Sequence, residues 1–340
     1  MKQDTIVEVK DLCVNFYTNQ RCNKALREVS FSIRKARTLC IVGESGCGKS
    51  VTANSIMQLL PDLGRIESGT ITYHGEDETV HIEKLPRNGR KMRSLRGEHI
   101  AMIFQDPMTA LNPVFSVGYQ IEEMIREHLE LSHSRSSELA VKLLKDMGVP
   151  LPEQRVREYP HQYSGGMRQR AMIAMAMACA PKVLIADEPT TALDVTIQAQ
   201  IFELMLALKE EKQMAILLIT HDMGVVAELA DDVAVMYMGN IVESGTAEQV
   251  MSSPSHPYTR ALLDSIPVLG RGKAQNLEPI RGTTPDPYNR PAGCQFEPRC
   301  DYATELCRRQ MPTEESVNAS DREEKPHMVR CFNYKELTHV

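Results

Sequence analysis

The chain has 340 residues, of which 42% are hydrophobic and 25% are charged, and its formal net charge is −6. This composition is typical of a soluble globular chain of about two domains, so it excludes intrinsic disorder over most of the length. The negative charge argues against a nucleic-acid binder, and the longest apolar runs, such as residues 214–220, are far shorter than the ~20 residues of a membrane span.

The first chemical motif follows a short apolar run at residues 38–42, which has the length of a buried strand. The run leads into Gly43-Glu-Ser-Gly-Cys-Gly-Lys49-Ser50, the pattern G-x-x-x-x-G-K-[ST]. Its glycines let backbone N–H groups curl around phosphate oxygens, and a helix predicted over residues 51–60 adds its positive N-terminal end. The motif therefore predicts a nucleotide-phosphate site, in which Lys49 reaches the phosphates and Ser50 ligates Mg²⁺.

A second strand is predicted at residues 100–104 and ends in Gln105. The Gln105 amide can both donate and accept a hydrogen bond, so it could contact the metal or the attacking water while the loop at 106–113 moves. Helix-like stretches follow at residues 117–129 and 136–147.

Residues 163–170 read Tyr-Ser-Gly-Gly-Met-Arg-Gln-Arg and have the pattern of a helix N-terminus. Ser164 would cap the helix, and Gly165 and Gly166 would present bare amides, which makes a second anion-binding device. One chain does not need two phosphate cradles for one nucleotide. In the simplest arrangement, the Gly43 loop of one chain holds a nucleotide and the Ser164 helix of a second chain closes over it. Two nucleotides then lie between two head-to-tail copies.

Two further strands end in polar residues. The strand predicted at 183–186 is followed by Asp187 and Glu188, and the strand at 215–220 is followed by His221. Asp187 is placed to hold Mg²⁺, and Glu188 to act as the general base that polarises a water. His221 could contact the γ-phosphate, although a histidine alone in this place is more often structural. Polar residues at the C-terminal ends of all these strands indicate an open parallel α/β sheet.

The composition changes near residue 266. Residues 266–340 contain eight of the 19 prolines and have balanced charges, with eleven Lys/Arg and eleven Asp/Glu. Four of the nine cysteines (Cys294, Cys300, Cys307 and Cys331) also lie in this tail, whereas the other five are scattered and are expected to be buried apolar residues or bystanders. We expect a loop-rich extension that has too few apolar positions for a core of its own.

The order and spacing of these motifs, together with Ala192-Leu193-Asp194, resemble the ABC-type ATPases over about residues 5–265. The resemblance implies an ATPase with a P-loop NTPase (RecA-like) core, an ABC β-subdomain and a helical subdomain at about 106–180. It makes Phe16 or Tyr17 the aromatic that stacks on adenine, and either could instead be a strand core residue. The residues it implies at the ATP site are Gly43, Glu44, Ser45, Gly46, Cys47, Gly48, Lys49, Ser50, Val51, Gln105, Asp187 and His221, with Ser164, Gly165 and Gly166 from the opposing copy. It also makes Glu188, His221 and Gln105 the catalytic residues, and Ser50, Gln105 and Asp187 the Mg²⁺ ligands.

Four longer segments resemble the oligopeptide/dipeptide importer ATPases in particular. They are residues 43–46, 104–113, 187–200 and 256–263. The resemblance implies a second ATPase subunit, identical or not, two membrane permease subunits and an extracytoplasmic binding protein. The N-terminus lacks an apolar signal-peptide core, so we expect a peripheral protein on the cytoplasmic face of the membrane. Import of nickel or another small solute, and a soluble ABC ATPase, remain the alternatives.

The tail cysteines have the spacing Cys294-x₅-Cys300-x₆-Cys307-x₂₃-Cys331. Four thiolates are the usual ligands of a [4Fe–4S] cluster, whereas structural zinc sites more often use pairs two to four residues apart. The pattern around Gly293–Cys300 also resembles tails of this importer subfamily, of which some carry such a cluster. The spacing leaves three interpretations of the tail cysteines. They hold a [4Fe–4S] cluster, they hold Zn²⁺ with His327 as a spare ligand, or they bind no metal.

Overall fold

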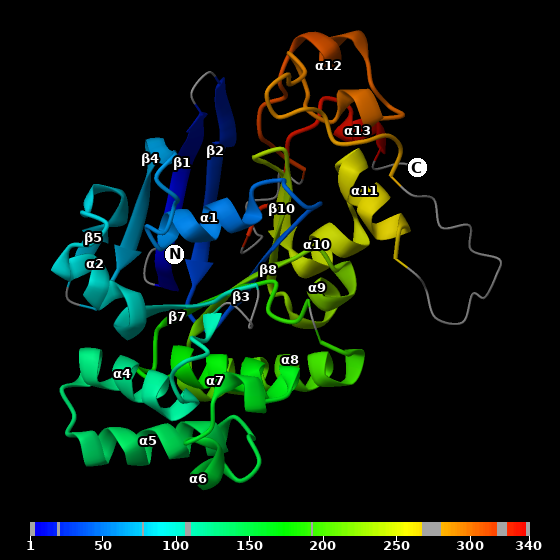
Figure 1. Ribbon diagram of the computed structural model, residues 1–340. Coiled ribbons are helices and arrows are strands. Elements are labelled where there is room, and N and C mark those ends of the chain that lie inside the picture. The colour runs from blue at the N-terminus through cyan, green and yellow to red at the C-terminus, as the bar shows by residue number, and fades with distance from the viewer. Residues whose placement is uncertain are drawn as a thin grey trace. The chain divides into compact units, whose positions relative to one another are not determined.

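The computed structural model describes residues 4–18, 21–76, 78–105, 110–191, 193–266, 280–317 and 325–337 (Figure 1). The chain divides into two compact units. Unit 1 comprises the described parts of Met1–Ile6, Ile33–Arg37 and Lys84–Leu218, and unit 2 those of Val7–Ser32, Thr38–Glu83 and Ile219–Val340. In the described part of the chain, no helix combines the length and apolar character that a membrane span requires.

Unit 1 contains two parallel strands covered by helices. Strand β6 (Ile100–Ile103) pairs with β7 (Val183–Asp187), with Ile100 opposite Val183. Both strands are almost entirely buried apolar residues, as strands of a parallel sheet usually are. Strand β6 ends one residue before the predicted boundary, and Phe104 is exposed.

The helices of unit 1 follow the expected periodicity. Helix α4 (Val117–Leu129) buries Val117, Ile121 and Ile125, which are four residues apart and therefore share a face. Helix α5 begins three residues earlier than predicted, because its first turn is polar and carries no apolar signal. The helices of unit 1 are α2 (Arg90–Ser94), the π-helical turn η3 (Leu95–His99), α4, α5 (His133–Asp146), α6 (Pro152–Arg155), η4 (Pro160–Gln162), α7 (Gly165–Ala176) and α8 (Val195–Lys212).

Unit 2 has two sheets. The first has the strand order β2-β1-β4-β5, built from β1 (Thr5–Thr18), β2 (Arg21–Arg34), β4 (Gly64–His74) and β5 (Thr79–His81). In the second, β3 (Thr38–Val42) is parallel to β9 (Asp232–Tyr237), which is antiparallel to β10 (Asn240–Thr246). Strand β8 (Ala215–Thr220) begins in unit 1 and ends in unit 2.

The helices of unit 2 begin with α1 (Lys49–Ile56), which differs from the prediction of 51–60 at both ends. It starts inside the glycine motif, and it stops early because Gln58 adopts a left-handed conformation with φ 52°. The other helices are η2 (Ile82–Lys84, which reaches into unit 1), α9 (Met223–Leu229), α10 (Ala247–Ser252), α11 (Pro257–Asp264), η6 (Glu297–Arg299), α12 (Glu305–Arg309) and α13 (Tyr334–Leu337).

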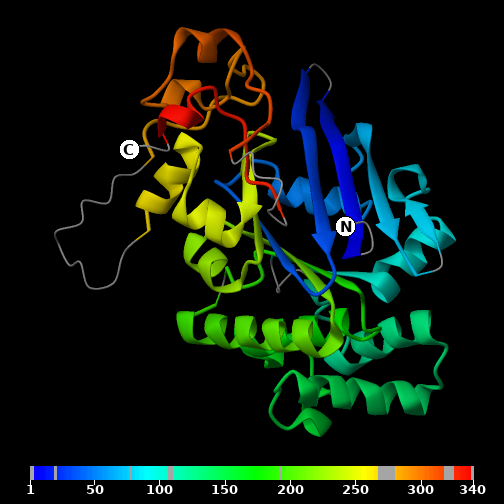
Figure 2. The same ribbon diagram turned by 180° about the vertical axis from the view of Figure 1, so that it is seen from behind.

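The described part of the tail belongs to unit 2 and lies near α11, as both views show (Figures 1 and 2). Strand β12 (Met328–Val329) pairs with β10 and with β11 (Glu315–Ser316), so the tail extends the second sheet. The buried Glu243 carboxylate joins the two parts, since it accepts hydrogen bonds from the Ser255 and His256 N–H groups and pairs with His327 Nε2 at 2.7 Å. A tail that is short of apolar residues thus gains order from the neighbouring sheet.

Candidate active site

The glycine motif forms a tight loop between β3 and α1 in unit 2. Gly48 has φ 113°, a conformation that side chains rarely adopt, and a Cβ on Gly43 would lie 2.2 Å from the Met236 carbonyl oxygen. Lys49 Nζ folds back over the loop and donates to the Gly43 carbonyl at 2.8 Å and the Glu44 carbonyl at 3.1 Å. The ammonium group therefore lies on the loop whose N–H groups are expected to receive phosphates.

The other residues of the loop differ in exposure. Ser45 and Gly46 are exposed, and Ser50 and Val51 are half-buried in the first turn of α1. Cys47 is buried, which raises the pKa of its thiol, and its backbone N–H donates to the Glu44 carbonyl at 3.3 Å. The loop thus offers backbone amides, two serine hydroxyls and one ammonium group.

Unit 1 brings Gln105 and Glu188 together. Gln105 Nε2 donates to Glu188 Oε2 at 3.0 Å, across 83 residues of sequence. Asp187 is the buried last residue of β7, and Glu188 follows it in a left-handed conformation with φ 46°. Asp187 and Glu188 therefore lie at the carboxyl end of β7, as predicted.

Thr191 also belongs to this group, although its role was not predicted from the sequence. Its hydroxyl lies 3.2 Å from Glu188 Oε2 and 3.1 Å from the Glu188 carbonyl oxygen. Three residues separate Thr191 from Glu188, the spacing of a turn that a hydroxyl can close, and this was the available signal. The Glu188 carboxylate thus has two hydrogen-bond donors beside it.

His221 directly follows β8 in unit 2 and is exposed. The next residue, Asp222, accepts the Gly224 N–H at 2.7 Å and caps α9. This cap fixes the backbone just beyond His221, which lies at the carboxyl end of its strand as predicted.

The Ser-Gly-Gly segment in unit 1 begins a helix. Ser164 Oγ accepts the Met167 N–H at 3.3 Å and caps α7, which has 12 residues. Ser164 and Gly165 are exposed, and a Cβ on Gly166 would lie 2.8 Å from Ile197 Cγ2. The N-terminus of α7 is therefore open to an anion from another molecule.

The segment at residues 192–194 is described in part, because Ala192 lies outside the described residues. Asp194 Oδ1 accepts the Ile197 N–H at 3.0 Å and caps α8. The helix start is consequently set by the carboxylate of this segment.

The two adenine-stacking candidates lie side by side on β1. Tyr17 is 38% exposed, its hydroxyl donates to Glu67 at 2.8 Å, and the Arg65 guanidinium lies 5.7 Å from its ring centroid. Phe16 is half-buried opposite Gly64. Because neighbouring strand residues point to opposite faces, only one of the two rings can face a given ligand.

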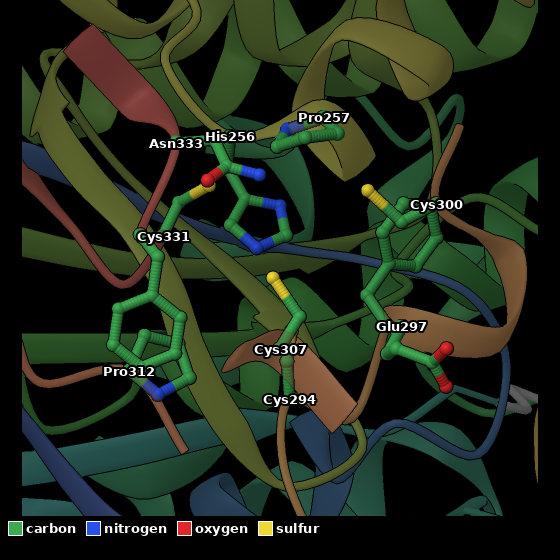
Figure 3. Close-up of a pocket in the computed structure, with 11 residues that line it drawn as sticks. His256, Pro257, Cys294, Glu297, Cys300, Cys307, Pro312, Cys331 and Asn333 are labelled. Carbon is green, nitrogen blue, oxygen red and sulfur yellow. The ribbon is translucent and has the colours of Figure 1, made fainter. Parts of the chain in front are cut away.

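All four tail cysteines line one pocket in unit 2 (Figure 3). Cys294 and Cys307 come together through the Cys294 N–H, which donates to the Cys307 carbonyl at 2.8 Å. Burial raises the pKa of Cys294, and it raises the pKa of Cys300 to about 11 and of Cys331 to about 12. Without a cation these three thiols are neutral at pH 7.

The structure places a different histidine at the cysteine pocket from the one that the sequence suggested. His327, the spare ligand of the zinc reading, pairs with Glu243 and is not among the pocket residues, whereas His256 lines the pocket. Among the described residues, no group of three or more His, Cys, Asp or Glu side chains is arranged to hold a metal ion.

Known proteins resemble the chain over both parts. A family model described as ABC transporter matches residues 26–191, and one described as the oligopeptide/dipeptide transporter C-terminal region matches residues 242–307. The chain is 48% identical over 307 residues to the dipeptide transport ATP-binding protein DppD of Haemophilus influenzae, covering 90% of this chain and 91% of that protein. It is 49% identical over 308 residues to the oligopeptide transport ATP-binding protein OppD of Bacillus subtilis, covering 90% and 84%.

Two solved structures show the same fold. MJ0796, described as a dimeric bacterial ABC transporter cassette, is 25% identical with a TM-score of 0.62, and the match covers 71% of this chain and 98% of that chain. The cbiO1 protein of Clostridium perfringens is 26% identical with a TM-score of 0.61, covering 74% and 92%. The α/β cassette fold predicted from the motifs is thus confirmed.

Proposed function

The chain belongs to the ABC transporter ATP-binding family, and we propose that it hydrolyses ATP to power the import of dipeptides or oligopeptides. The names of its relatives and the match of its C-terminal region to peptide transporters support the cargo class. Two groups of residues support the ATPase function. One is the glycine loop, over which Lys49 folds, and the other is the hydrogen-bonded pair of Gln105 and Glu188.

Each residue has a distinct task in this proposal. The loop amides and Lys49 bind the phosphates, and Ser50, Asp187 and Gln105 provide the hard oxygen ligands that suit Mg²⁺, which would neutralise charge on the phosphates. Glu188 accepts the proton of the attacking water, while Gln105 and His221 orient that water and the γ-phosphate. We assign adenine stacking to Phe16, because Arg65 and Glu67 already engage Tyr17.

A second ATPase subunit completes the site in this proposal. The exposed start of α7, with Ser164, Gly165 and Gly166, supplies amides to the ATP held by the opposing copy. The dimer described for MJ0796 supports this arrangement. Two permease subunits and an extracytoplasmic binding protein complete the transporter, which places the chain on the cytoplasmic face of the membrane. We also propose that residues 1–265 form the cassette, with its helical subdomain at about 106–180, and that 266–340 form the extension.

We propose that the pocket of four cysteines holds a [4Fe–4S] cluster rather than one Zn²⁺ ion, because four thiolates are the usual ligands of such a cluster. Sulfur atoms around one zinc lie about 3.8 Å apart, given Zn–S bonds of about 2.3 Å. A cluster spreads its ligands further, because each cysteine binds a different iron. The group would give the tail rigidity that its few apolar residues do not supply.

The ATPase proposal is tested with the chain reconstituted with its permease partners in vesicles. Lys49→Ala should lose most ATP affinity and all ATP-driven peptide uptake, because the ammonium group is the only cation that the loop itself supplies. Lys145→Ala, which changes an exposed lysine of α5, serves as control. Uptake by Lys49→Ala at the wild-type rate, or purification with ribosomes rather than membranes, would contradict the proposal.

The cluster proposal is tested by metal analysis of protein purified without oxygen. About four irons per chain and a brown colour are expected. Cys300→Ser should lose the iron, whereas Cys22→Ser, an exposed cysteine outside the pocket, should keep it. Colourless protein that contains one zinc per chain would contradict the cluster proposal and support the zinc site instead.

A further inference from the structure

The tail holds the phosphate-binding loop through one arginine in unit 2. Arg299 Nη1 donates to Glu44 Oε2 at 2.6 Å, and Nη2 donates to Oε1 at 3.0 Å, so the pair is bidentate. The Arg299 side chain is 3% exposed and that of Glu44 is 29% exposed. The two residues are 255 positions apart in sequence, and Arg299 directly precedes the pocket residue Cys300.

Arg299 is itself held in place. Its Nε donates to the Arg281 carbonyl at 2.8 Å, and its Nη1 lies 3.4 Å from the Tyr237 hydroxyl. The guanidinium carbon lies 5.8 Å from the Tyr237 ring centroid and 5.9 Å from that of Phe296, which also lines the cysteine pocket. These contacts leave the guanidinium group little freedom to turn away from Glu44.

Glu44 is the point at which three elements meet. Its backbone N–H donates to the hydroxyl of Tyr258, a buried residue of α11, at 2.8 Å. Its carbonyl accepts Lys49 Nζ at 3.1 Å, and its carboxylate binds Arg299. The position of Glu44 therefore determines where the lysine and the neighbouring amides of the loop lie.

The charge of Glu44 also needs an explanation. The loop is built to attract phosphate, and an unpaired carboxylate within it would repel the nucleotide. Arg299 brings a compensating positive charge, and its hydrogen bonds to Glu44 raise its pKa, so it stays charged. The pair removes a local repulsion that the loop sequence alone would create.

We propose that Arg299 is a positioning residue for nucleotide binding, which holds and neutralises Glu44 so that the cysteine-bearing tail sets the ATP affinity of the loop. The proposal rests on the proposed ATP-binding function. It assigns to the tail a task in the ATPase site that neither the loop motif nor the cysteines require.

The test measures the equilibrium Kd of a fluorescent ATP analogue on the full chain, with four variants. Arg299→Ala should raise the Kd by about tenfold or more, which corresponds to about 1.4 kcal/mol. Glu44→Gln should weaken binding less than Arg299→Ala does, because it removes the charge together with the need for compensation. The double variant Arg299→Ala/Glu44→Gln should recover to the Glu44→Gln value. Arg308→Ala, which breaks exposed tail ion pairs with Glu297 and Glu305, should match wild type.

Recovery in the double variant is the decisive result, because a merely structural role of Arg299 would leave the double variant as weak as the single one. A Kd for Arg299→Ala within about twofold of wild type, or no recovery, overturns the proposal. If Arg299→Ala does not fold, Arg299→Lys keeps the charge and loses the bidentate geometry, and it should raise the Kd by about threefold. An unchanged Kd for Arg299→Lys would then overturn the proposal. Failure of the wild-type chain to bind the analogue would instead contradict the proposed function.

Discussion

At the scale of single residues, the carboxylate of Glu188 is held by its neighbours before any substrate arrives. Gln105 and Thr191 lie 3.0 Å and 3.2 Å from the same oxygen, Oε2. The backbone of Glu188 adopts a left-handed conformation, which costs a non-glycine residue on the order of 1 kcal/mol. The strained turn and the two donors together direct the carboxylate, which suits the general-base role proposed for it.

Glu188→Gln should keep ATP affinity within about threefold and lower turnover by about 10²–10⁴-fold, because an amide cannot take a proton from water. Phosphate release and ATP binding, measured on the same preparation, separate the two effects. Glu203→Gln, on the exposed face of α8, is the matched control and should hydrolyse ATP normally. Turnover of Glu188→Gln near the wild-type rate would remove Glu188 as the base.

At the scale of elements, the start of α11 depends on a neutral histidine. His256 is 2% exposed, and its Nδ1 accepts the Tyr258 N–H at 3.0 Å as the cap of the helix. Burial lowers the pKa of His256 from 6.5 to about 4, although Glu243 acts in the opposite direction. The same helix supplies the Tyr258 hydroxyl that holds the phosphate-binding loop.

The pKa of His256 makes stability depend on pH. The unfolded chain takes up a proton at this histidine near pH 6.5, whereas the folded chain resists it until about pH 4, so acid favours unfolding. We expect the free energy of unfolding to fall by up to about 3 kcal/mol between pH 6.5 and 4 from this group.

Urea midpoints measured between pH 7 and pH 4.5 test this expectation. His256→Asn keeps a side-chain acceptor for the cap and removes the titration, so its midpoint should fall less with acid than that of wild type. Parallel pH profiles for the two proteins would show that His256 does not carry the dependence.

At the scale of the whole molecule, the second copy is expected to supply the other half of each ATP site. Ser164→Glu places a negative charge at the exposed start of α7, where the γ-phosphate of the opposing copy would bind. In the Glu188→Gln background with ATP, we expect a dimer on gel filtration that this change abolishes. Ser134→Glu, on the exposed surface of α5, should leave the dimer intact. A dimer that survives Ser164→Glu would contradict the arrangement.

The sequence by itself determined the cassette fold, the phosphate loop and the strands that end in Asp187 and His221. These features are local, because a short contiguous segment carries both the backbone geometry and the chemistry of each. The ends of α1 and α5 were predicted less well, since a left-handed residue or a polar first turn gives no periodic signal.

Only the tertiary structure decided which distant residues meet. The hydrogen bond between Gln105 and Glu188, which are 83 residues apart, and the presence of His256 rather than His327 at the cysteine pocket depend on how strands and helices pack. The Arg299–Glu44 pair joins residues 255 positions apart, because strand β12 and the aromatic rings of unit 2 bring the tail to the loop. Periodicity and motif spacing report local geometry, whereas these contacts arise from long-range packing that no segment encodes alone.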